Sequence, residues 1–245
     1  GRRTLITEAG GNNRRDDIQD VGRLNQLWHT EADWDYYTVP QPHAADRRIH
    51  IPRGRVLGGS HSLNAAIWVR CAPEDFDGWA ADGAAGWSWK DVEPIYRRIE
   101  RWTGEPSPLR GTEGLLPVEE NQPMHPVQES IIAAAVEEGL PRNPDYNGTS
   151  MEGVSRQQVT MEYGERVSTW DAYAQPAVAE GRLEVRSGVS VRRVLFEGTR
   201  AVGVELQGAH GIETVTADEV ILAAGTFGSA EILLRSGVGP AEDLR

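Results

Sequence analysis

Runs of apolar and β-branched residues between turn-forming segments are the clearest pattern in the chain, and they predict strands. Residues 4–7 (TLIT) form such a run, which the Ala9-Gly10-Gly11 break after Glu8 ends in a turn. Residues 220–224 (VILAA) are wholly apolar and lead through a small-residue turn into a helix ending at Ser236-Gly237. An apolar strand followed by a helix is typical of a parallel sheet covered by helices.

Residues 183–217 predict an antiparallel meander. Three runs there (LEVRSGVSVRRVLFEG, RAVGVELQG and IETVTA) are separated by turns at 197–199 and 207–211. Upstream, residues 88–102 carry apolar side chains at 92, 95, 96 and 99 behind Ser88 as a possible N-cap, which predicts an amphipathic helix. A second helix is expected over 126–141. The fold class is therefore mixed α/β.

Composition limits the kinds of partner. The 245 residues are 39% hydrophobic, enough for a globular core, and carry a net charge of −12 from 25 basic and 37 acidic residues. Binding to nucleic acid needs clustered basic residues, and here they are scattered in an acidic chain, so we expect no nucleic-acid partner. The chain shows no apolar run near the roughly 20 residues of a membrane helix and no signal peptide at its start, so we expect a soluble, cytoplasmic protein with no membrane partner.

Metal and disulfide chemistry are not predicted. Cys71 is the only cysteine, so the chain can form no internal disulfide and no thiolate cluster. The six histidines show no i, i+4 pair and no second ligand type in a metal pattern, and we therefore expect no metal site.

Two features are candidates for ligand binding. Glu8 follows a predicted strand, as does the acidic residue that binds a ribose hydroxyl in dinucleotide-binding folds, but a solvated strand-end carboxylate is the favoured interpretation of such a residue when it stands alone. Residues 53–64 form a glycine-rich loop after the extended, proline-containing segments around Pro40, Pro42 and Pro52. Glycine lets a phosphate or a flat ring approach the backbone, but it is also common in structural turns.

Four ordered segments together resemble the glucose-methanol-choline (GMC) oxidoreductase family. LITEAGG resembles the end of the family's second Rossmann strand, and PRGRVLGGSHSLNAAIWVR resembles its first signature. DFDGWA with GWSWKDVEPIYRRIE resembles the segment that follows, and AAGTFGSAEILLRSGVGPAEDL resembles the second signature. The resemblance implies a Rossmann-like FAD-binding domain with a β-meander, and oxidation of a small-molecule alcohol by hydride transfer to flavin N5.

The same resemblance implies the cofactor-binding residues. Gly58 and Gly59 would let the backbone approach FAD, and Ser60 and Asn64 would hydrogen-bond near the pyrophosphate and the flavin ring. The rest of the implied set is Glu8 on the adenosine ribose, Val191 at the adenine edge, Arg53 or Arg55 near phosphate, and Ala65 and Gly225 within the two signatures. For each arginine, a purely structural role is an equal alternative.

Three positions depart from the family pattern. Leu63 stands where some members carry a histidine covalently bound to FAD, so we expect FAD to be non-covalent. His61 replaces a small residue and is interpreted as a surface residue, a polar neighbour of the flavin or a displaced attachment point, in that order. Ala230 replaces a common proline near the start of a helix.

The resemblance also implies that the chain is a central fragment. The family's upstream G-x-G-x-x-G loop and its C-terminal catalytic histidine have no counterpart here, so no catalytic residue is assigned. We expect the first part of the FAD-binding domain at 1–110, the start of a substrate-binding domain at 111–165, and the second part of the FAD-binding domain at 166–245. The alternatives are a non-catalytic flavin-binding half of a split protein and a lyase that retains FAD.

Overall fold

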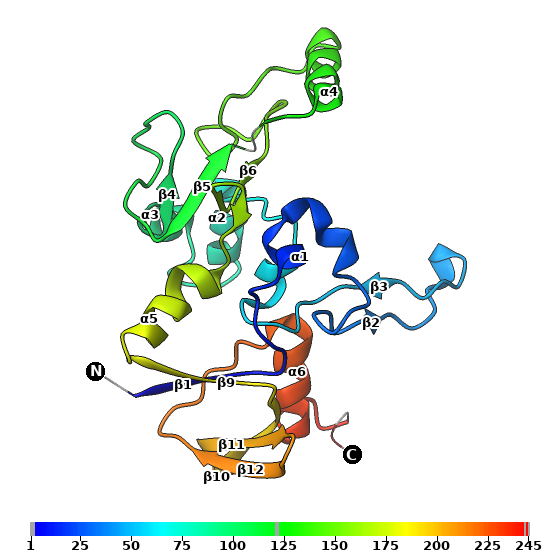
Figure 1. Ribbon diagram of the computed structural model, residues 1–245, viewed down its shortest axis with the longest axis vertical. Coiled ribbons are helices and arrows are strands. Elements are labelled where there is room, and N and C mark those ends of the chain that lie inside the picture. Colours follow the sequence, from blue (N-terminus) through cyan, green and yellow to red (C-terminus); the bar gives the residue numbers. More distant parts are fainter. Residues whose placement is uncertain (1–2, 121–122, 243, 245) are drawn as a thin grey trace.

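Two distant segments pair to form the parallel strands of the fold. The computed structural model describes residues 3–120, 123–242 and 244. In it, β1 (Thr4–Glu8) pairs in parallel with β9 (Leu183–Ser187), with Ile6 opposite Val185 (Figure 1). The predicted strand at 4–7 is confirmed, and helices and strands mix along the chain as expected for a mixed α/β protein.

The predicted meander is confirmed over its last three strands and corrected in its first run. Strands β10 (Ser190–Glu197), β11 (Arg200–Gly208) and β12 (Gly211–Thr216) form an antiparallel sheet. The run that begins at residue 183 is not one strand, because Gly188 takes a φ of +72° and turns the chain between β9 and β10. Gly188 therefore separates the parallel pair from the meander.

The prediction of a strand over 220–224 is wrong for this structure. A strand needs a neighbouring backbone to hydrogen-bond, and this segment pairs with none of the described strands. Ile221 is 79% exposed as a result. The helix after it is present as α6 (Gly225–Arg235), which lies beside the meander (Figure 1), where Ser236 Oγ accepts a 2.8 Å hydrogen bond from Val194 N–H.

Both predicted helices of the middle region form, with shorter bounds. The first is α3 (Trp89–Ile99), which ends because the chain becomes β4 (Glu100–Trp102), and Ser88 occupies the N-cap position but hydrogen-bonds the Asp91 carboxylate. The second is α4 (Pro126–Glu137). An additional helix, α2 (Pro73–Ala81), was not predicted.

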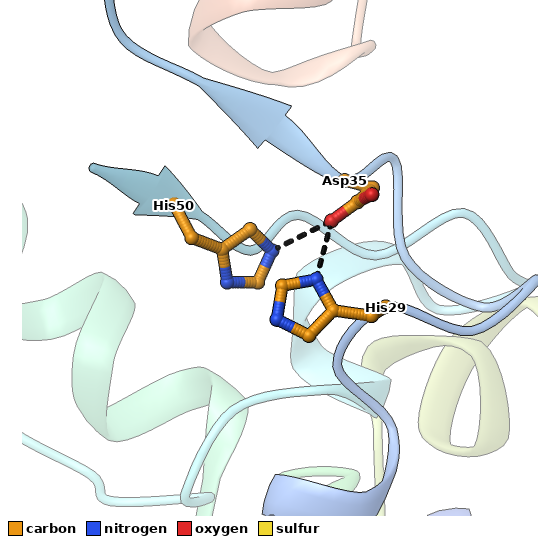
Figure 2. Close-up of side chains that lie close together, drawn as sticks. All are labelled: His29, Asp35 and His50. Atoms are coloured by element: carbon orange, nitrogen blue, oxygen red, sulfur yellow. Dashed lines mark hydrogen bonds and ion pairs between the residues drawn. The ribbon is translucent and has the colours of Figure 1, made fainter. Parts of the chain in front are cut away.

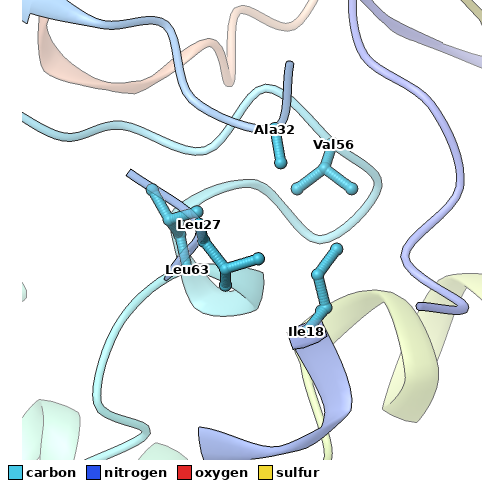
Figure 3. Close-up of a cluster of buried hydrophobic side chains, with 5 residues drawn as sticks. All are labelled: Ile18, Leu27, Ala32, Val56 and Leu63. Atoms are coloured by element: carbon cyan, nitrogen blue, oxygen red, sulfur yellow. The ribbon is translucent and has the colours of Figure 1, made fainter. Parts of the chain in front are cut away.

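Extended segments around the prolines form a short hairpin, β2 (Tyr36–Tyr37) with β3 (His50–Ile51). The glycine-rich loop that follows β3 packs on a compact apolar cluster, drawn in Figure 3, that contains Ile18, Leu27, Ala32, Val56 and Leu63. Two residues of the loop itself, Val56 and Leu63, therefore hold it against the core.

Several short elements complete the fold. A three-stranded sheet contains β4, β5 (Leu116–Glu120) and β6 (Gln158–Val159). Its strand β4 lies before the domain boundary expected at residue 110, and β5 and β6 lie after it. The boundary itself stays a prediction. No helix of the described residues is long and apolar enough to cross a membrane. The remaining elements are α1 (Asp16–Gln19), η1 (Val21–Gln26), η2 (Pro42–Ala44), η3 (Gly59–Ser62), β7 (Met161–Glu162), β8 (Glu165–Arg166), η4 (Trp170–Ala174) and α5 (Gln175–Ala179).

A buried carboxylate joins the segments around this sheet. Glu100 is fully buried, and its Oε2 accepts bonds from Arg70 NH2 (2.8 Å) and Trp68 Nε1 (3.0 Å). Its Oε1 accepts a 2.6 Å bond from Arg110 Nε, and Arg110 NH1 continues to Asp145 at 2.8 Å. Buried charges are tolerated only when they are paired in this way.

Replacing Glu100 with glutamine should destabilise the chain strongly. The substitution leaves Arg70 and Arg110 buried without their counter-charge, a loss of about 3–5 kcal/mol in the free energy of unfolding, measurable by urea denaturation. Glu231→Gln is the matched control, because its pair with Arg235 is exposed and is worth less than about 1 kcal/mol. Equal stability of the two variants would contradict this prediction.

Candidate functional site

Two backbone segments approach so closely that only glycine fits between them. A β-carbon on Gly10 would lie 1.8 Å from Arg55 O. The neighbouring Gly11 forms a bridge with Val56, and its carbonyl accepts a 2.9 Å bond from Leu57 N–H. This contact joins the end of β1 to the start of the glycine-rich loop.

Glu8 therefore lies at the junction of β1, the loop and the β9–β10 turn. Its Oε1 accepts a 2.8 Å bond from Gly10 N–H. Burial raises the pKa of this carboxyl, although bonds from the Gly10 and Ala9 backbone and the charge of Arg55 lower it in part. A strand-end carboxylate that is desolvated, with one oxygen already bonded, is suited to accept from a ligand hydroxyl with the other.

Val191 is close to this junction along β10. The N–H groups of Gly188 and Val189 donate to Gly10 O and Glu8 O, both at 3.1 Å. These bonds hold the start of β10 against the end of β1, and Val191 follows two residues later with a half-buried side chain. The structure thus brings Glu8 and the beginning of β10 together.

The loop glycines fall into two groups. Gly54 and Gly58 face protein atoms, since β-carbons there would lie 2.2 Å from Gly59 O and 2.3 Å from Ser62 Oγ. Gly59 takes a φ of +56° and has open space beside it. The first group shapes the turn, and Gly59 presents bare backbone to a ligand. Next to it, Ser60 Oγ accepts a 3.0 Å bond from Gly54 N–H and keeps its own hydroxyl proton free to donate.

The second signature contacts the first through an aromatic ring. The Arg53 guanidinium lies 5.3 Å from the centre of the Phe227 ring, and Tyr36 packs edge-on against the same ring at 5.9 Å. Phe227 belongs to the first turn of α6, two residues after Gly225, which has a φ of +76° and open space beside it. Arg53 is therefore held at a ring, and its NH1 donates to Pro52 O.

Asn64 and Ala65 lie at the far end of the loop, against a different set of residues. Asn64 Oδ1 accepts from Ala66 N–H at 2.8 Å and from Arg166 NH1 at 3.1 Å. Ala65, half-buried, is part of the turn that this amide closes. Among the contacts described for the chain, none joins either residue directly to Glu8.

Leu63 and His61 point into the protein. Leu63 is 4% exposed and packs in the apolar cluster. The N–H of Thr169 donates to His61 Nδ1 at 3.2 Å, so Nε2 carries the proton and donates to Thr160 Oγ1 at 2.7 Å. Burial and the neighbouring charge of Arg166 lower the pKa of His61 to about 4. His61, interpreted first as a surface residue, is only partly exposed, and both of its ring nitrogens have partners.

A buried polar cluster behind the loop was missed from the sequence. Arg166 donates from Nε to Ile18 O and from NH1 to His61 O, both at 2.9 Å. Burial lowers its pKa to about 10. Close by, Asp171 accepts from Asn13 Nδ2 at 3.0 Å. Nothing in the sequence marks Arg166, because the partners of its side chain lie more than 100 positions away.

Acidification should destabilise the chain through His61. The pKa of His61 is lowered from 6.5 to about 4 in the folded chain, so the folded state favours the neutral ring. This preference contributes its full stability at pH values above 6.5, and the contribution is lost as the pH falls from 6.5 toward about 4. The loss amounts to roughly 3 kcal/mol. Urea unfolding at a series of pH values should show this slope in the native chain and in His210→Gln, an exposed control, but a flatter one in His61→Gln. The same slope in His61→Gln would contradict the assignment.

Known proteins resemble this chain along nearly its whole length. The oxygen-dependent choline dehydrogenase of Photobacterium profundum is 38% identical over 240 residues, which are 96% of this chain and 42% of that protein. The crystal structure of pyridoxine 4-oxidase from Mesorbium loti superposes with a TM-score of 0.93 at 34% identity, over 99% of this chain and 48% of that one. An FAD-dependent oxidoreductase from Chaetomium thermophilum gives 0.88 at 28% identity, over 97% and 44%.

These proteins are all longer than the present chain, which spans less than half the length of each. A family model described as GMC oxidoreductase matches residues 10–244. That range includes the glycine-rich loop, the buried Glu100 cluster and α6. The chain therefore belongs to the GMC oxidoreductase family.

Proposed function

We propose that this chain is the flavin-binding part of an FAD-dependent oxidoreductase that acts on the CH–OH group of a small-molecule alcohol. The observation that carries the proposal is the family match over residues 10–244. Two of the similar proteins are named for reactions of choline and pyridoxine, which are both alcohols, and a third is named as FAD-dependent. The proposal covers the whole protein, of which this chain is one part.

The residues present fit an FAD molecule at four places. Glu8 offers a desolvated carboxylate with one oxygen held by Gly10 N–H, which suits a ribose hydroxyl near the start of β10 and Val191. Gly59 presents open backbone with the Ser60 hydroxyl beside it, which suits the flavin end. Gly225 offers similar open space at the first turn of α6. Arg53, next to Phe227, supplies positive charge for a phosphate.

Bound FAD supplies a hydride acceptor at flavin N5. The chain's own residues hold and orient it: Glu8 would accept a hydrogen bond from the ribose, and Ser60 and Asn64 would hydrogen-bond near the pyrophosphate and ring. The backbone at Gly59 and Ala65 would line its approach, on the turn that Gly58 shapes. Leu63 has no nucleophilic atom and packs in the core, so we propose non-covalent binding. No residue of this chain is assigned as the catalytic base.

Other expectations about the whole protein stay part of the proposal. The acidic composition supports small-molecule partners over nucleic acid. We place the protein in the cytoplasm, and the β1–β9 pair with its helices supports a Rossmann-like arrangement. The division at 110 and 165 into FAD-binding and substrate-binding parts belongs to the same proposal.

Anaerobic reduction of the flavin tests the function. Mixing the holoprotein with a primary alcohol, with choline and pyridoxine as first probes, should bleach the visible absorption of oxidised flavin and yield one aldehyde per flavin reduced. A matched trimethylammonium compound without a hydroxyl group should cause no bleaching. Product formation without any flavin reduction would favour a lyase, and an absence of bound flavin would overturn the proposal.

Substituting Glu8 with glutamine should separate binding from stability. Since burial raises the pKa of this carboxyl, its stabilising contribution is present below the ordinary pKa and lost as pH rises, so Glu8→Gln should raise the thermal midpoint at neutral pH. Loss of a charged hydrogen bond of about 1.5–3 kcal/mol should weaken FAD binding about ten- to a hundredfold, measured by flavin fluorescence in the holoprotein.

Glu197→Gln is the control for this substitution, because Glu197 ends β10 in an exposed position. It should change neither the midpoint nor the affinity. A Glu8→Gln protein that is stabilised but binds FAD as tightly as the native one would show that Glu8 is only a desolvated strand end.

A further inference from the structure

Three potential metal ligands converge beside the β2–β3 hairpin, although they are far from any regular spacing in the sequence. Figure 2 shows the rings of His29 and His50 turned toward the Asp35 carboxylate. His29 Nδ1 lies 2.6 Å from Asp35 Oδ1, and His50 Nε2 lies 3.3 Å from the same oxygen. The three ligand atoms all lie within 4.8 Å of one another.

We propose that His29, Asp35 and His50 form a binding site for a divalent transition-metal ion such as Zn²⁺. Two imidazoles and one carboxylate are a ligand set that suits Zn²⁺. Zinc bonds of about 2.0–2.2 Å in a tetrahedron separate neighbouring ligand atoms by roughly 3.3–3.5 Å. The pair from His50 to Asp35 already has this separation, and the pair from His29 needs to open by less than about 1 Å.

A buried carboxylate beside the cluster holds one of the rings in place. Asp33 has a fully buried side chain, and its Oδ2 lies 2.9 Å from His50 Nε2. Its Oδ1 accepts bonds from Arg53 N–H at 2.9 Å and Asp35 N–H at 3.1 Å, so it cannot turn away. Asp33 therefore fixes the position of the His50 ring, but it contacts the same nitrogen that would bind the ion, so an ion would replace this hydrogen bond.

The backbone also holds the cluster in a costly conformation. His29 and Asp35 take φ values of +60° and +53°, in the left-handed region that non-glycine residues seldom adopt. The His29 and His50 rings lie with centroids 4.1 Å apart, and Tyr37 Oη lies 3.3 Å from His29 Nδ1. His29 and Asp35 are each about half exposed, which leaves an ion a route in and a fourth position for water.

Binding would exchange hydrogen bonds for metal bonds. Each neutral imidazole gives the lone pair of its ligand nitrogen to the ion, so the proton that this nitrogen donates to a carboxylate in the metal-free chain moves to the other ring nitrogen, Nε2 in His29 and Nδ1 in His50. The ion would replace the shared carboxylate hydrogen bonds, joining the turn after η1 to both strands of the hairpin. This site does not depend on FAD, and it departs from the expectation of no metal site.

Calorimetric titration of the untagged chain with Zn²⁺ tests the proposal. One ion per chain should bind. His29→Ala, Asp35→Asn and His50→Ala should each weaken Zn²⁺ binding by at least about 10- to 100-fold. His43→Ala is the matched control, because His43 is exposed in the same hairpin outside the cluster. It should leave the affinity unchanged.

Two further readouts separate a lost site from a lost fold. Circular dichroism should show the same spectrum for every variant without metal, and Co²⁺ should give visible d–d bands in the native chain and His43→Ala only. Zn²⁺ should raise the thermal midpoint of those two proteins alone. Absence of stoichiometric binding, or equal weakening by His43→Ala and His50→Ala, would overturn the proposal.

Discussion

The close approach of Gly10–Gly11 to the backbone of residues 55–57 is the constraint on which the site depends. A side chain at Gly10 would overlap Arg55 O, so β1 could not end where it does against the loop. With glycine there, the Leu57 N–H reaches Gly11 O, and Glu8 is brought beside Arg55. A single contact between main chains therefore positions both the carboxylate and the loop that would meet the cofactor.

The second support of the fold is electrostatic and lies apart from this contact. Glu100 receives bonds from Arg70 and Arg110, and Arg110 also stacks on Trp102 with its guanidinium 3.9 Å from the ring centre. This buried cluster fastens α3, β4 and the loop around Asp145. Its role is structural, because every charge in it is paired within the protein and it contacts none of the loop glycines.

The sequence predicted what depends on local chemistry. The strand at 4–7, the helices at 89–99 and 126–137 and the glycine-rich loop follow from periodicity and turn residues, and the family resemblance rests on short motifs. Prediction from the sequence failed where contacts with distant residues decide the structure. Residues 220–224 have the composition of a strand but no neighbour to pair with, and the run at 183 joined β1 because Gly188 redirects the chain. The partners of His61 and Arg166 are likewise distant in sequence, so burial of their charges could not be inferred.

Asp33 connects the two regions for which functions are proposed. One of its oxygens accepts the Arg53 N–H at the start of the glycine-rich loop, and the other lies against His50 in the histidine cluster. A buried carboxylate with this many partners has one stable orientation, since any rotation would leave donors unpaired. Order in the hairpin and order at Arg53 therefore depend on the same side chain. An ion held by His29, Asp35 and His50 would take the place of the His50 bond, whereas the backbone N–H groups of His29, Asp35 and Arg53 would still hold the carboxylate.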